Sequence, residues 1–235
     1  MAADLTRLAG VTIAFDLDGT LVDTAPDLVG TLNVLLAEEG LTPLAMEIGR
    51  PMIGRGAKAL IQRGFDAAGA PLESARLEAL FERFLQHYNA HIADESVPFE
   101  GMIAALEVLK AAGAKLAVCT NKRTDLSRRL LDTLDLSHLF EAIVGPDAAG
   151  CQKPDPRHLL HTVEAVGGRP DRVIMVGDAA TDAGAGKAAG AGLILVTFGY
   201  TETPVAELGA DVLIDHFDQL IAACARLVEP ETGAR

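Results

Sequence analysis

The sequence predicts an α/β protein with a Rossmann-like parallel sheet core and an inserted small all-helical domain. Strand and helix patterns alternate from Pro98 onward, which is typical of a mostly parallel sheet covered by helices on both faces. Residues 22–95, by contrast, show helical patterns only. We therefore expect residues 1–21 and 96–235 to form the core domain, and residues 22–95 to form the helical insert.

The first element is an apolar strand over residues 11–15, which leads directly into Asp16-Leu17-Asp18-Gly19-Thr20. Helical stretches follow, because leucine and phenylalanine recur at helical spacing and Gly40 ends the first of them. The helices expected in the insert cover residues 26–39, 57–68 and 71–91.

The same patterns define the elements of the core after Pro98. Apolar runs of four to six residues predict strands, and longer amphipathic stretches predict helices. Helices are expected over residues 102–112, 124–134, 157–166, 182–189 and 217–227, and strands over 115–120, 142–144, 173–176, 193–197 and near Val212. Residues 230–235 are expected to form a frayed tail.

Composition limits the possible partners. The formal net charge of −13 over 235 residues argues against a nucleic-acid partner, which needs a basic face, and it favours binding of a divalent cation. The three cysteines, Cys119, Cys151 and Cys224, are too far apart to indicate a disulfide framework or a zinc site. The chain shows neither a secretory leader nor an apolar run that could span a bilayer, so we expect a cytoplasmic protein without a membrane partner.

Asp16 and Asp18 are the strongest candidates for chemistry. On an extended chain their side chains point to the same side while Leu17 points into the protein, and ligands in open α/β sheets bind at the carboxyl ends of strands. Two carboxylates this close repel each other unless a cation or a shared proton compensates. The alternative is a strand that ends in an ordinary Asp-Gly turn.

Other expected strand ends carry polar residues as well. Thr120-Asn121-Lys122 follows one strand and Gly177-Asp178 another, Asp182 lies one helical turn after Asp178, and Lys153 precedes a helix. All of them would open on one edge of the sheet. Each also has an ordinary interpretation, such as a helix cap for Asp178, a helix-dipole contact for Asp182 and a solvated loop lysine for Lys153.

Taken together, these motifs resemble those of the haloacid dehalogenase superfamily of hydrolases, and the chain is similar to the phosphoglycolate phosphatase branch. Residues 16–24 match the first motif, Thr120-Asn121 the second, Lys153-Pro154 the third, and Gly177-Asp178 with Asp182 the fourth. The resemblance covers essentially the whole chain, and residues 22–95 resemble the small helical cap of these enzymes.

The resemblance implies a Mg²⁺-dependent phosphomonoesterase that hydrolyses a small phosphorylated metabolite, with 2-phosphoglycolate as the leading candidate. Asp16 would attack phosphorus and form an aspartyl-phosphate, and Asp18 would protonate the leaving group and then deprotonate water. The metal would be held by Asp16, the main-chain carbonyl of Asp18 and Asp178, with Asp182 orienting this shell from behind.

The resemblance also implies roles in holding the substrate. Thr120, Asn121 and Lys153 would bind the phosphate. Arg55, in a glycine-flanked loop of the insert, could bind a substrate carboxylate, together with Lys58; the alternative is a solvent-exposed arginine. Many relatives carry a serine where this chain has Ala179, which removes one hydrogen bond near the metal shell.

Several other functions stay open, because one fold hosts many activities. A sugar-phosphate mutase would need a phosphorylated activator, a pyrophosphatase is a further rival, and a phosphonate hydrolase would need a lysine such as Lys58 for a Schiff base. A non-catalytic metabolite-binding module would be expected to lack one of Asp16, Asp18, Lys153 or Asp178, and all four are present. The sequence does not distinguish a monomer from a homodimer.

Overall fold

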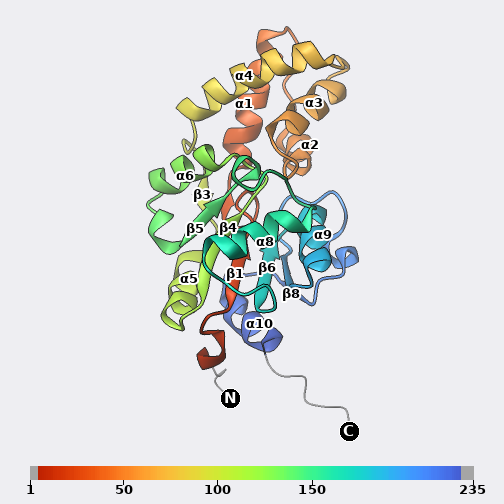
Figure 1. The fold of residues 1–235 in the computed structure, drawn as a ribbon. Helices are drawn as coiled ribbons and strands as arrows, with labels where there is room; N and C mark the ends of the chain where they lie inside the picture. Colours follow the sequence, from red (N-terminus) through yellow and green to blue (C-terminus); the bar gives the residue numbers. More distant parts are fainter. Residues whose placement is uncertain (1–4, 229–235) are drawn as a thin grey trace.

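The computed structural model describes residues 5–228, so the tail expected over residues 230–235 lies outside the described part (Figure 1). Its centre is a six-stranded, wholly parallel sheet, which confirms the predicted α/β core. In spatial order the strands are β5 (Ala142–Val144), β4 (Lys115–Cys119), β1 (Thr12–Phe15), β6 (Val173–Gly177), β7 (Gly192–Val196) and β8 (Val212–Ile214).

Strand β1 lies in the middle of this sheet and determines where the polar strand ends meet. Phe15 is in register with Val118 on one side and with Val176 on the other. The residues that follow β1, β4 and β6 therefore leave the sheet at the same edge. This is the place where open parallel sheets bind ligands.

Helices cover both faces of the sheet, and the strands are apolar on both sides for that reason. Ile13 and Phe15 belong to the core under α5 (Met102–Ala111) and α10 (Leu220–Leu227), whereas Ala14 faces the opposite layer. That opposite layer consists of α8 (Pro156–Ala165) and α9 (Ala180–Ala189), and α6 (Thr124–Thr133) packs beside β5.

The helices of residues 22–95 gather at the end of the molecule opposite α10 (Figure 1). The helix that contains Gly64 and the helix that contains Leu32 approach closely, since a Cβ at Gly64 would lie 2.5 Å from a methyl group of Leu32. Phe65 and Phe84 are buried in the same apolar cluster. The four α-helices are α1 (Ala25–Glu38), α2 (Met46–Gly49), α3 (Ala57–Ala67) and α4 (Ser74–Ala90).

Two chain crossings join these helices to the sheet. They form a small antiparallel pair of strands, β2 (Val22–Asp23) and β3 (Val97–Pro98). Beside them the buried carboxylate of Asp27 accepts hydrogen bonds from the backbone N–H and the hydroxyl of Ser96, at 2.8 and 2.6 Å. The sequence did not predict this pair, because two-residue strands produce no detectable periodicity.

The expected helices and strands are present, with ends that differ by at most three residues. The expected last helix begins as a 3₁₀ turn, η5 (Phe217–Gln219), before α10. The short helix α7 (Pro146–Ala149) was not predicted. Within residues 5–228 no helix combines the length and the apolar character needed to cross a bilayer.

Candidate active site

The candidate site is built around a buried lysine that contacts two aspartates. Lys153 has a fully buried side chain, and its Nζ lies 2.9 Å from Oδ1 of Asp16 and 2.6 Å from Oδ1 of Asp182. The other oxygen of Asp182 accepts the backbone N–H groups of Asp178 and Ala179, at 3.1 and 2.9 Å. Asp182 therefore fixes the start of α9 and the ammonium group together.

Asp178 is held in place by two further hydrogen bonds. Its Oδ1 accepts from the Thr20 hydroxyl at 3.1 Å, and its Oδ2 accepts from the backbone N–H of Tyr200 at 2.6 Å. One carboxylate oxygen each of Asp16, Asp178 and Asp182 lies within 4.8 Å of the others, and all three residues are buried. The predicted metal-site carboxylates are thus brought together.

The electrostatics of this cluster suit a cation. Burial raises the pKa of Asp16 to about 6; the Lys153 ammonium opposes this shift, whereas Asp182 adds to it. Burial also raises the pKa of Asp178 well above its ordinary value, and the charges of Asp182 and Asp16 add to that effect. One ammonium group does not compensate three buried carboxylates, and hard divalent cations prefer such oxygen ligands. The residues present therefore fit Mg²⁺.

Asp18 lies at the edge of the cluster and has its own partners. Its carboxylate accepts from Lys122 Nζ at 2.9 and 3.2 Å and from the Thr24 hydroxyl at 2.8 Å. Lys122 is buried and lies 4.5 Å from the centre of the Tyr88 ring, which belongs to α4. Burial alone would lower the pKa of Lys122, but the charge of Asp18 and the contact with Tyr88 raise it. The group therefore stays cationic.

The two predicted phosphate-binding residues after β4 differ in their availability. The hydroxyl oxygen of Thr120 accepts the backbone N–H of Lys122 at 3.1 Å. The side-chain amide of Asn121 donates to the carbonyl oxygens of Gly54 and Lys153 and accepts the Lys153 N–H. The side chain of Asn121 is thus fully occupied in joining the helical insert to the lysine loop. Within the described residues its backbone N–H has no partner and is free to donate.

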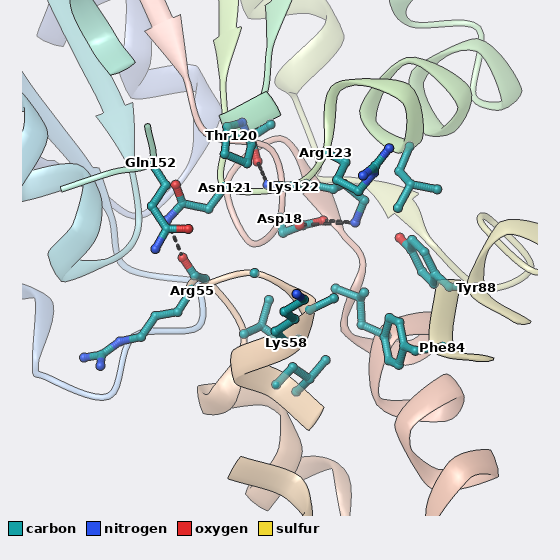
Figure 2. Close-up of a pocket in the computed structure, with 18 of the residues that line it drawn as sticks. Asp18, Arg55, Lys58, Phe84, Tyr88, Thr120, Asn121, Lys122, Arg123 and Gln152 are labelled. Atoms are coloured by element: carbon teal, nitrogen blue, oxygen red, sulfur yellow. Dashed lines mark hydrogen bonds and ion pairs between the residues drawn. The ribbon is translucent and has the colours of Figure 1, made fainter. Parts of the chain in front are cut away.

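A cavity of about 230 Å³ opens beside these groups, between the strand ends and the helical insert. Phe84 and Tyr88 of α4 line it together with Asp18 and Lys122 (Figure 2). The insert contributes most of the apolar part of the wall, including Leu28, Ile53, Leu60, Phe81, Phe84 and Leu85. The cavity therefore combines polar groups at the strand ends with apolar side chains of the insert.

Arg55 comes from the loop that lines this cavity, but its guanidinium group is not at the cluster. The side chain points away from Asp18 (Figure 2), is 61% exposed and lies 4.0 Å from a carboxylate oxygen of Glu202. Lys58, its suggested companion, forms an ion pair with Glu78 at 2.7 Å. In this arrangement neither cation contacts the groups at the strand ends.

Four contributors to the site were given no role by the sequence reasoning: Thr20, Thr24, Lys122 and Tyr200. The first two lie within the first motif, and Lys122 directly follows the second, so their position next to the predicted residues was an available signal. Tyr200 carries no such signal. It is one of two aromatic residues shortly after an apolar strand, which are most simply interpreted as part of the core.

Comparison with known proteins gives a consistent picture. The sequence profile of the haloacid dehalogenase-like hydrolases matches residues 13–196. The phosphoglycolate phosphatase of Caulobacter vibrioides is 55% identical over 97% of this chain and 98% of its own length, and that of Agrobacterium fabrum is 46% identical over 89% and 90%. The crystal structure of a predicted phosphoglycolate phosphatase from Haemophilus somnus 129PT superposes with a TM-score of 0.83 at 30% identity, covering 90% of this chain and 96% of that one.

Proposed function

Because the chain belongs to the haloacid dehalogenase-like hydrolase family, we propose that it is a Mg²⁺-dependent phosphomonoesterase that hydrolyses 2-phosphoglycolate. The observation that carries the proposal is the position of Asp16, which lines the cavity and is buried beside Lys153 and two further carboxylates. Similarity to relatives that are named phosphoglycolate phosphatases supports the choice of substrate.

In this proposal Asp16 is the nucleophile. Its carboxylate attacks phosphorus, the bond to the leaving oxygen breaks, and an aspartyl-phosphate forms. Lys153 holds one oxygen of Asp16 at 2.9 Å, which orients the other oxygen toward the substrate and places positive charge beside the phosphoryl group. The Thr120 hydroxyl and the free backbone N–H of Asn121 donate hydrogen bonds to the same group.

Asp18 moves the protons. It protonates the glycolate oxygen as that group leaves, and it then takes a proton from the water that attacks the aspartyl-phosphate. Lys122 and Thr24 hold its carboxylate in place at the edge of the cavity. Asp18 therefore acts first as an acid and then as a base on the same face of the phosphorus atom.

Mg²⁺ would be held by the carboxylates of Asp16 and Asp178 and by the main-chain carbonyl of Asp18. When bound, it supplies the positive charge that the carboxylate cluster and the phosphoryl oxygens lack. Asp182 would act from behind this shell, because one of its oxygens accepts from Lys153 and the other from the backbone N–H groups of Asp178 and Ala179. Its role is to orient the start of α9, and with it Asp178.

We further propose that residues 22–95 act as a cap over the strand ends. The pair β2 and β3 provides the connection, and the cap contributes the apolar wall of the cavity. Closing this wall over the substrate excludes water from the phosphoryl group. Arg55 would bind the substrate carboxylate only after it leaves Glu202. A reducing compartment such as the cytoplasm suits the enzyme, because the structure shows its three cysteines as free thiols.

The test is phosphate release from 2-phosphoglycolate by the purified protein, with Mg²⁺ present or removed by a chelator. We expect Mg²⁺-dependent turnover that Asp16→Asn abolishes, together with lower kcat/KM for pyrophosphate, a phosphonate and a hexose phosphate supplied with a phosphorylated activator. Preference for one of these alternatives would replace the proposed substrate. A lack of turnover on all of them would favour a metabolite-binding module.

A further inference from the structure

The loop that follows β7, residues 198–203, contacts both the candidate cation site and the helical cap. Near its centre lies Tyr200, which is only 3% exposed although it belongs to a loop. The phosphatase chemistry described above gives this residue no role. Its contacts point in two directions.

Toward the cation site, the loop backbone is packed directly against Asp178. The backbone N–H of Tyr200 donates to Oδ2 of Asp178 at 2.6 Å. This approach requires Gly199, because a Cβ at that position would lie 2.1 Å from the Cβ of Asp178. It also requires Gly19, which has φ +84° and where a Cβ would lie 2.8 Å from the Tyr200 ring. The ring and the carboxylate are therefore held in one rigid arrangement.

Toward the cap, the phenol group of the same residue reaches the connection between the two parts. The Tyr200 hydroxyl donates to Asp23 in β2 and accepts the backbone N–H of Ala25, at 3.2 Å, at the start of α1. Burial, reinforced by the hydrogen bond to Asp23, raises the pKa of Tyr200 well above its ordinary value, so the hydroxyl keeps its proton. The hydroxyl thus contacts the segment about which a moving cap would turn.

A cap residue completes the arrangement. Arg50, at the start of the 3₁₀ turn η2 (Arg50–Met52), has its guanidinium carbon 5.2 Å from the centre of the Tyr200 ring. The same guanidinium forms an ion pair with Asp23 at 3.3 Å. Two residues along the loop, Glu202 forms an ion pair with Arg63 of α3. The cap is therefore joined to this loop at two separate points.

We propose that Tyr200 is a positioning residue that couples the position of the cap to cation binding at Asp178. The inference rests on the cation site assigned under the proposed function. The cap orients the ring through Asp23 and Arg50, and the backbone of the same residue orients the carboxylate. Coupling of this kind is reciprocal: a cap in this position strengthens cation binding, and a bound cation holds the cap in this position.

The test uses Tyr200→Phe, which removes the hydroxyl and its two hydrogen bonds but keeps the ring and the backbone N–H to Asp178. Mn²⁺ serves as the probe, and its dissociation constant is measured by electron paramagnetic resonance without substrate. Although no ligand atom is lost, we expect roughly fivefold weaker Mn²⁺ binding, the equivalent of one buried hydrogen bond. Hydrogen exchange supplies the reciprocal readout: Mn²⁺ should slow exchange at residues 22–27 in the wild type and not in the variant.

A matched control comes from the same loop. The Thr201 hydroxyl donates to the carbonyl oxygen of Thr203 at 2.7 Å, which lies in the same loop and belongs neither to the cap nor to the cation site. Thr201→Val should therefore leave both readouts unchanged. At position 23, Asp23→Asn keeps an oxygen that accepts the phenol proton, whereas Asp23→Ala does not. Mn²⁺ binding should accordingly be closer to the wild type in Asp23→Asn than in Asp23→Ala.

The outcomes separate the two claims. If the wild type binds no Mn²⁺, the cation site of the proposed function is wrong, and this inference fails with it. If the wild type binds Mn²⁺ and Tyr200→Phe binds it equally well, or no more weakly than Thr201→Val, only the coupling is refuted. If Tyr200→Phe does not fold, the comparison of Asp23→Asn with Asp23→Ala decides, and equal affinities there refute the coupling.

Discussion

Replacing Lys153 by methionine should destabilise the protein strongly, because the ammonium group compensates two buried carboxylates. Its Nζ lies 2.9 Å from Asp16 and 2.6 Å from Asp182, and the three side chains are 4% exposed or less. Methionine preserves most of the side-chain volume, so the loss is mainly electrostatic. Removing one partner from a buried ion pair costs about 3–5 kcal/mol of unfolding free energy.

The loss should depend on pH in a defined direction. The pKa of Asp16 is already raised to about 6, and without Lys153 the folded-state pKa of this carboxyl rises further. A carboxyl whose pKa is higher in the folded than in the unfolded state reduces stability as pH rises from the unfolded value through the folded one. The unfolding free energy of Lys153→Met should therefore be closer to that of the wild type at pH 5 than at pH 8.

Urea unfolding at both pH values measures this, with Lys58→Met as the matched control. Lys58 forms a similarly short ion pair with Glu78 at 2.7 Å, but the two side chains are 47% and 59% exposed. Exposed pairs of this kind contribute about 0–1 kcal/mol. A loss below about 1 kcal/mol in Lys153→Met, or a loss that does not grow between pH 5 and pH 8, would refute the account of the buried cluster.

Three further predictions concern the nucleophile, the packing of the site and a buried histidine. Asp16→Asn should abolish turnover without lowering the unfolding free energy, because the raised pKa of Asp16 means that its charged form is disfavoured in the folded protein. Retained turnover in steady-state assays would exclude covalent catalysis by this residue. Gly199→Ala should displace Asp178, lower the unfolding free energy measured in urea by about 1–3 kcal/mol, and raise the Mg²⁺ concentration for half-maximal activity. Gly30→Ala is the control, because a Cβ there meets nothing within 4 Å, and it should have none of these effects. Burial lowers the pKa of His158 to about 4, so the neutral imidazole favours folding, and this contribution to stability is lost as pH falls from 6.5 to 4. Over that range the unfolding free energy of His158→Gln should rise relative to that of the wild type by up to about 3 kcal/mol. A difference that does not change with pH would contradict this.

Much of the fold could be predicted from the sequence, because buried parallel strands are continuous apolar runs. Strands β1, β4 and β6 are such runs, and each is followed directly by polar residues. The pair β2 and β3 could not be predicted in the same way. Its strands are two residues long and are defined by pairing across about 75 positions of the chain, which local periodicity does not report.

The candidate site, too, could be predicted only in part. Asp16 and Asp178 could be predicted, because residues that follow neighbouring parallel strands meet at one edge of the sheet. Lys153 lies in the loop before α8, and its place beside Asp16 was implied by the family resemblance. The directions of long side chains could not: Arg55 turns toward Glu202, a residue that comes close only through the tertiary fold. The role of Tyr200 depends on the packing of its ring against Gly19, which is distant in the sequence, and on the close approach of Gly199 to Asp178; neither contact has a local sequence pattern.

The central claim is that Asp16 takes the phosphoryl group before water does, and trapping that intermediate tests it most directly. The protein is mixed with 2-phosphoglycolate and Mg²⁺, quenched in acid within one turnover, digested and analysed by mass spectrometry. The account predicts that the peptide containing Asp16 carries one phosphoryl group, which hydroxylamine removes and which is absent from Asp16→Asn. Rapid release of phosphate from substrate, with no phosphorylated Asp16 at any time before the first turnover is complete, would contradict it.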